Sequence, residues 1–246
     1  MSYVLIHGGA TTGRYWDRVI PFLDGPALAP NLPGRLDEPG DVATMTVSDG
    51  AHAVVRQIEA SPFADRDDLV IVAHSSGGLE TPEVVEALGA DRIQAIVLNA
   101  ASVPPEGGNG FDCMQERHRG LALEALAASE ASGRPIVTPK PDPERMRTTS
   151  GDELGDEDHA FAADPVRLVE DSFVVYTSPV HWSKTGGIPT TYIVNTRDRA
   201  VPPDLQREMA SHLPGEPDII DLDSGHLPAV TQPQRFAELV HAARRR

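Results

Sequence analysis

Short, continuously apolar runs alternate with longer amphipathic segments along most of the chain. Runs of this length, rich in β-branched residues, are typical of strands that helices cover on both faces of a sheet. The expected strands are Tyr3–Ile6, Leu69–Ala73, Gln94–Asn99, Thr191–Asn195 and Asp218–Leu222, with a less marked run at Ala27–Ala29.

The segments between these runs carry apolar residues at helical spacing. Ala51, Val54, Val55 and Ile58 recur at i, i+3, i+4 and i+7 and predict one buried helix face, with Ser48 as its N-cap. Two more helices are expected from Pro202 to about His212 and from Pro233 through the stripe Phe236, Leu239, Val240 and Ala243. This strand–helix repetition predicts the α/β class, with a mostly parallel, doubly wound sheet and right-handed crossovers.

The segment 103–187 departs from this alternation. It contains a helical stretch at Leu121–Ala128 but no sheet rhythm. A stretch of roughly 85 residues is too long for an ordinary connection, so it is expected to have structure of its own. We therefore expect 1–102 and 188–246 to form the core. The segment 103–187 is expected to form a largely helical cap over the carboxyl edge of the sheet, where open α/β sheets bind ligands.

The chain is acidic, with 37 Asp and Glu against 21 Lys and Arg and a net charge of −16. This charge disfavours nucleic acid and anionic membrane as partners. The single cysteine, Cys113, excludes an internal disulfide framework, and no Cys/His cluster has zinc-site spacing. No metal or organic cofactor is expected. The first apolar run is too short for a signal peptide, so we expect a soluble, cytoplasmic protein. The acidic loop Gly151–His159 and the tail Arg244–Arg246 are expected to be solvated, mobile surface.

The sharpest chemical signal is a nucleophile elbow. An apolar strand leads directly into His74–Gly78, and a helix follows. In such an elbow the nucleophile sits on a strained turn, and the residues two before and two after it crowd each other, so both must be small. Ser75 meets this requirement with Ala73 and Gly77, whereas Ser76 would place a histidine on the tight side. The alternative is a plain Ser-Gly loop; the strand and the partners below favour Ser75 as a nucleophile.

Candidates for the base and the acid follow later strands, in the chain order Ser, Asp, His. His226 lies between the last expected strand and the last helix, a position that none of the other eight histidines shares. Asp198 follows the preceding strand. Asp221 and Asp223 rival it, but they lie too close to His226 along the chain to reach its far ring nitrogen. Together with Ser75, Asp198 and His226 would form a triad that activates the serine hydroxyl.

Acyl transfer also needs donors that stabilise a developing oxyanion. The backbone N–H of Ser76, directly after the nucleophile, and that of Gly9, in the loop after the first strand, are the expected donors. A phosphate-binding loop is the alternative, because Gly8 and Gly13 have the outer spacing of a P-loop. An Arg-Tyr pair stands where Lys-Ser/Thr is required, so nucleotide binding is disfavoured.

These motifs together resemble the α/β-hydrolase superfamily. The resemblance rests on His7-Gly8-Gly9, the elbow Ala73–Gly78, Arg197–Pro203 and Ser224–Pro228. The segments Leu98–Pro104 and Tyr192–Pro202, with Gln206, are most similar to the methylesterase/hydroxynitrile-lyase branch and its bacterial esterase relatives. The resemblance implies the same triad and the same oxyanion hole as the residues do.

Lyase chemistry is not expected. Lyases of this branch typically carry Thr where this chain has Gly8 and Lys where it has Leu227. We expect a serine hydrolase that cleaves a carboxylic ester or lactone of a small molecule through an acyl-enzyme on Ser75. Two alternatives stay open. The same triad could perform carbon–carbon cleavage, transacylation or cyclisation of a natural-product intermediate, or the fold could serve as a non-catalytic ligand-binding protein.

The substrate pocket depends on the first loop and on the cap. Arg14 is a candidate partner for a substrate carboxylate at the pocket mouth, or a plain surface residue. Aromatic residues in such segments either line an apolar pocket or form the core of the cap, and the second role is the commoner one. The candidates are Tyr15, Trp16, Phe111, Met114, Phe161, Phe173, Tyr176 and Trp182.

Overall fold

The computed structural model describes residues 1–151 and 154–243. Its centre is a six-stranded sheet of order β2-β1-β3-β4-β7-β8, in which every pairing is parallel. The strands are β1 (Ser2–Ile6), β2 (Ala27–Leu28), β3 (Leu69–His74), β4 (Ile93–Asn99), β7 (Thr190–Asn195) and β8 (Asp218–Leu222). Each bound lies within about one residue of the expected run, and the parallel α/β fold is confirmed.

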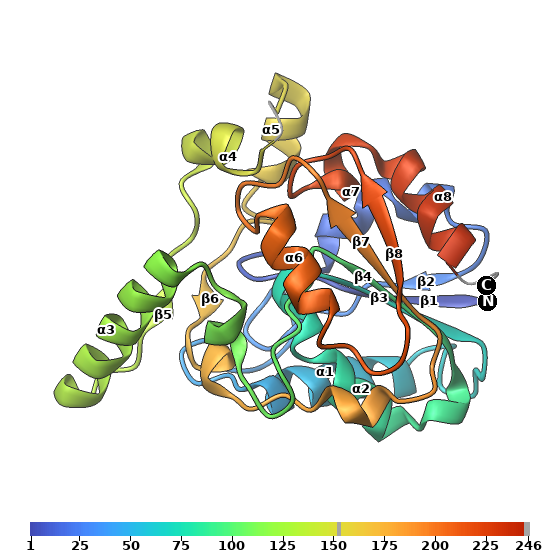
Figure 1. Cartoon of the computed structure of the whole chain (residues 1–246), viewed down its shortest axis with the longest axis horizontal. Coiled ribbons are helices and arrows are strands. Elements are labelled where there is room, and N and C mark those ends of the chain that lie inside the picture. The colour runs from blue at the N-terminus through green and yellow to red at the C-terminus, as the bar shows by residue number, and fades with distance from the viewer. Residues whose placement is uncertain (152–153, 244–246) are drawn as a thin grey trace.

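Helices cover both faces of this sheet (Figure 1). The first face carries α1 (Val47–Glu59), α2 (Thr81–Leu88) and α6 (Pro203–Ala210), and the second carries α7 (Pro228–Thr231) and α8 (Pro233–Ala243). Alternate residues of β3 serve the two sides: Ile71 packs in the first hydrophobic cluster, Val70 and Val72 in the second. This two-sided burial explains why the strands read as continuous apolar runs.

The start of α1 differs from the expectation. Thr46, not Ser48, is the N-cap: its hydroxyl accepts a hydrogen bond from the Asp49 backbone N–H at 3.2 Å. The Asp49 carboxylate in return accepts one from the Thr46 N–H at 2.9 Å. This reciprocal pair satisfies two backbone donors, so the prediction of Ser48 as the cap was wrong.

The described part of the segment 103–187 contains three α-helices, short 3₁₀ turns and a small antiparallel sheet. The α-helices and strands are α3 (Glu116–Ser132), α4 (Pro143–Thr149), α5 (Asp156–Ala162), β5 (Val137–Thr138) and β6 (Asp171–Ser172). Helix α3 projects away from the central sheet and buries none of its residues (Figure 1). The last part of the segment returns to the core, where Val175, Val180 and Trp182 join the cluster that contains α2.

The acidic stretch expected as a loop is partly helical. Asp156 to His159 form the first turn of α5, where Asp158 pairs with Arg18. Acidic residues suit this position because the N-terminus of a helix carries a partial positive charge. Asp152, Glu153 and the tail 244–246 lie outside the described residues. Among the helices that are described, none has both the length and the apolar character needed to cross a membrane.

Candidate active site

Strand β3 ends in a strained turn. Ser75 follows it directly and has a φ of +51°, in the left-handed region that non-glycine residues rarely adopt. A 3₁₀ turn over Ser75–Gly78 then leads towards α2. The turn is tightly enclosed, because a Cβ on Gly77 would lie 2.5 Å from the carbonyl oxygen of His7. This is the geometry of a nucleophile elbow, which presents the serine hydroxyl at the end of the sheet.

Three side chains from three separate loops meet at this turn. The Nε2 atom of His226 lies 3.1 Å from Ser75 Oγ, and its Nδ1 atom lies 2.7 Å from Asp198 Oδ2. Because a carboxylate only accepts hydrogen bonds, Nδ1 carries the ring proton, and Nε2 accepts the hydroxyl proton of the serine. The structure therefore brings together the three residues that the sequence singled out.

The Asp198 carboxylate is buried, with 3% of the residue exposed, and is hydrogen-bonded from several sides. Oδ1 accepts from the backbone N–H groups of Ala200 at 2.8 Å and Val201 at 2.9 Å. Oδ2 accepts from Gln206 Nε2 at 3.2 Å, and the Gln206 Oε1 atom accepts from the Asn195 N–H at 2.9 Å. These donors fix the carboxylate and offset the cost of burying a charge.

The two rival aspartates serve elsewhere. Asp221 pairs with Arg207, and Asp223 pairs with Arg197. Both carboxylates are largely exposed, in contrast to that of Asp198. Asp198 is therefore the aspartate that contacts Nδ1 of His226.

The backbone of His226 is held on both sides. Its carbonyl oxygen accepts a hydrogen bond from His74 Nε2 at 2.8 Å, and its N–H donates to the Ser150 carbonyl at 2.6 Å. The His74 ring stacks on Tyr15, with ring centroids 4.8 Å apart. Burial, followed by the neighbouring His226, keeps the pKa of His74 well below its usual value, so its ring is neutral. The sequence assigned no role to His74 beyond its size.

The loop after β1 lies against the nucleophile. A Cβ on Gly8 would lie 2.9 Å from Ser75 Cβ. The next residues are fixed by a buried ion pair: Asp171 accepts a hydrogen bond from the Ala10 backbone, while Arg35 pairs with Asp171 and donates from Nε to the Thr11 carbonyl at 3.1 Å. Of the two residues predicted as oxyanion donors, Gly9 lines one cavity together with Ser75, and Ser76 lines another.

Three ionisable groups are buried behind this loop. Arg35 and Glu80 are each 1% exposed, and Asp171 is 3% exposed. Burial raises the pKa of Asp171, and Arg35 opposes that rise. Burial also raises the pKa of Glu80 to about 8. Sequence reasoning missed all three residues; the one available signal was a glutamate at position 80, two residues after the elbow.

Two small cavities meet at Ser75. The first has a volume of about 170 Å³ and is largely apolar, with Pro141, Met146, Leu168 and Leu227 around His226. The second has a volume of about 140 Å³ and carries many polar groups. These are Ser76, Ser102, Gln115, His118 and Tyr176. Together the two cavities reach only the lower end of the roughly 300–1,000 Å³ that is typical of small-molecule sites.

Two of the proposed pocket residues, Met114 and Tyr176, line the second cavity. Others serve packing: Tyr15, Trp16 and Trp182 are buried in the core, Phe111 packs on Phe173, and Phe161 lies under Arg18 and Arg167. Arg14 is a surface residue that pairs with Asp17 at 2.9 Å.

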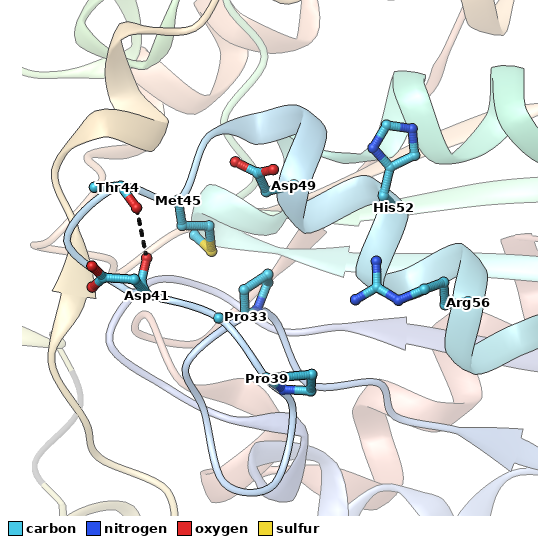
Figure 2. A pocket seen from close by; sticks show the side chains of 9 residues that line it. Pro33, Pro39, Asp41, Thr44, Met45, Asp49, His52 and Arg56 are labelled. Carbon is cyan, nitrogen blue, oxygen red and sulfur yellow. Dashed lines mark hydrogen bonds between the residues drawn. The ribbon is translucent and has the colours of Figure 1, made fainter.

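A separate, open depression of about 370 Å³ lies beside α1, between that helix and the loop that precedes it (Figure 2). Its charged side chains are engaged in local structure. Asp49 caps α1 through Thr46, and Arg56 pairs with Glu38. None of the residues that line it belongs to the triad.

Comparison with known proteins places these features in a family. The model of the alpha/beta hydrolase family matches residues 3–239. A pyrethroid hydrolase of Sphingobium wenxiniae is 26% identical over 249 residues, which cover 96% of this chain and 85% of that protein. A probable hydrolase, R7, of a Phoma species is 24% identical over 221 residues, covering 87% of this chain and 85% of that protein.

Solved structures share the fold. An extracellular alpha/beta-hydrolase from a Paenibacillus species has a TM-score of 0.80 at 23% identity, covering 99% of this chain and 98% of the other. The methylesterase MES16 from Arabidopsis has a TM-score of 0.73 at 16% identity, covering 99% and 98%. The resemblance drawn from the motifs is confirmed, and the chain belongs to the alpha/beta hydrolase family.

Proposed function

We propose that the protein is a serine hydrolase that cleaves small carboxylic esters or lactones. One observation carries the proposal: the continuous chain of hydrogen bonds from Ser75 through His226 to Asp198, at a strained turn. The names of similar proteins support ester hydrolysis, since they include a pyrethroid hydrolase and a methylesterase.

In this mechanism Ser75 Oγ attacks the ester carbonyl carbon, and His226 Nε2 takes the hydroxyl proton. The Asp198 carboxylate orients the imidazole and stabilises its charged form. The backbone N–H groups of Gly9 and Ser76 stabilise the tetrahedral oxyanion. His226 then returns the proton to the departing alcohol oxygen, and a water molecule, activated by the same ring, releases the acid from the acyl-enzyme.

The proposal treats 1–102 and 188–246 as the core and 103–187 as a cap that shapes access to the serine. It is supported by the lining of the first cavity, to which Met146, Ser150 and Leu168 contribute from this segment. A small-molecule ester is the proposed partner, and its two halves would occupy the two cavities that meet at Ser75.

The test compares initial rates on short p-nitrophenyl esters for the wild type and Ser75→Ala. We expect the variant to lose activity by about 10⁴-fold or more, because the nucleophile and its base act as a unit. Ser132→Ala, on the exposed helix α3, is the matched control and should keep wild-type rates. Equal melting temperatures would show that the fold is intact. Retention of most of the activity in Ser75→Ala, or no hydrolysis by the wild type across a panel of esters and lactones, would overturn the proposal.

A further inference from the structure

The two cavities at Ser75 indicate where the alcohol half and the acyl half of an ester bind. His226 must return a proton to the leaving alcohol oxygen, so the alcohol has to lie on the side of this ring. His226 lines the first cavity and does not line the second. The apolar first cavity, with Met146 and Leu227, therefore takes the alcohol. The second cavity, whose lining is partly polar, takes the acyl group.

Tyr176 and Ser76 form a polar wall in the second cavity. The Ser76 hydroxyl donates a hydrogen bond to the Tyr176 oxygen, which leaves the phenolic proton for another acceptor. Both reach the edge of the oxyanion loop, because a Cβ on Gly9 would lie 2.9 Å from Tyr176 Oη and 3.1 Å from Ser76 Oγ. Burial, and then the nearby Asp171, raise the pKa of Tyr176, so the phenol keeps its proton and can donate it in a hydrogen bond.

We propose that this polar wall is an acyl subsite, and that the preferred substrates carry an ether or hydroxyl oxygen on the carbon next to the ester carbonyl. The inference rests on the proposed ester hydrolysis and names its substrate class. With the carbonyl carbon at Ser75 Oγ and its oxygen at the Gly9 and Ser76 amides, a substituent on the adjacent carbon is the next group to face Tyr176. An oxygen there accepts the phenolic proton.

An alkyl group in the same place would cover the phenol and offer its proton no acceptor. A buried donor left unpaired in this way costs about 1–3 kcal/mol, so the site discriminates against the alkyl acyl group. The wall therefore selects by hydrogen bonding, between acyl groups of equal length.

The experiment compares benzyl methoxyacetate with benzyl butanoate, which differ by one oxygen in place of a methylene group. The ratio of their kcat/KM values is measured for the wild type and for Tyr176→Phe. The difference in intrinsic reactivity between the two esters cancels when the two ratios are compared, because both proteins act on the same pair of esters. We expect the ratio to fall about five- to tenfold in Tyr176→Phe, as for the loss of one hydrogen bond.

Tyr3→Phe is the matched control, because it removes a hydroxyl that bonds Asp24 away from the site. Its ratio should equal that of the wild type. Ser76→Ala, which keeps the backbone N–H, gives the same test if the melting temperature shows that Tyr176→Phe does not fold. An unchanged ratio in the folded variant overturns the subsite while ester hydrolysis stands. No hydrolysis of either ester by a wild type that cleaves other esters also overturns the subsite. No hydrolysis across the whole panel of esters and lactones overturns the proposed function, and the subsite with it.

Discussion

The buried carboxyl group of Glu80 should make the fold less stable as the pH rises. Glu80 precedes α2, and its Oε2 atom has no hydrogen-bond partner in the described part of the chain. Burial is the largest cause of its raised pKa, from 4.5 to about 8. Asp171 and Glu83 add to the rise, while a backbone hydrogen bond and Arg35 oppose it. The native protein therefore holds Glu80 protonated at neutral pH.

The sign of the effect follows from proton binding. Between pH 4.5 and about 8, the unfolded chain has lost the Glu80 proton while the native state retains it, so unfolding releases a proton and becomes easier as the pH rises. At about 1.4 kcal/mol for each tenfold change in proton affinity, the whole range amounts to at most roughly 5 kcal/mol. Glu80→Gln keeps the shape and removes the titration. Its free energy of unfolding, relative to that of the wild type, should increase over this range.

The assay is urea unfolding, followed by tryptophan fluorescence, at several values from about pH 5 to about pH 9. Trp16 and Trp182 are both buried, so their emission reports loss of the core. Glu86→Gln, an exposed glutamate on the same helix, is the control and should follow the wild type at every pH. Curves for Glu80→Gln and the wild type that stay parallel across the range would refute the reasoning.

Two further predictions test local geometry, each with a second substitution for comparison. Gly77→Ala places a Cβ 2.5 Å from the His7 carbonyl oxygen, so it should displace the elbow, lower the melting temperature and reduce ester hydrolysis on the order of 100-fold. Gly120→Ala lies inside α3, where a Cβ meets nothing within 4 Å and alanine favours the helix, so it should leave ester hydrolysis unchanged and should not lower the melting temperature. Thr46→Ala should lower the free energy of unfolding by about 1 kcal/mol in urea titrations, and Ser48→Ala by less. The reverse order for this last pair would make Ser48 the cap.

The sheet and the elbow could be predicted from the sequence because both depend on local rules. A strand buried on two faces must be apolar along its length, and β3 is apolar from Leu69 to Ala73. The elbow requires small residues two positions before and two positions after the nucleophile. Ala73 and Gly77 therefore identified Ser75 without knowledge of the fold. Asp198 was harder, yet its place after a strand sufficed, because parallel strands end at one edge.

The surroundings of the nucleophile could not be predicted in the same way. Arg35 and Asp171 are 136 positions apart, and neither belongs to a periodic pattern or a motif. Tyr176 was one of several aromatic candidates, and only the fold shows that it meets Ser76. Contacts of this kind are set by how the inserted segment returns to the core, which no local rule describes.

The buried charges behind Gly9 explain why the acyl subsite should favour a neutral polar group. One cation, Arg35, faces two carboxyl groups, and an uncompensated charge in this interior would cost several kcal/mol. Asp171 is the carboxylate that Arg35 contacts, and it also accepts backbone N–H groups, so Glu80 is the group that keeps its proton. The cluster then carries no net charge at neutral pH. Next to this neutral cluster, Tyr176 offers the substrate a hydrogen-bond donor but no positive charge. Such a site suits an ether or hydroxyl oxygen of the acyl group better than a carboxylate of the substrate.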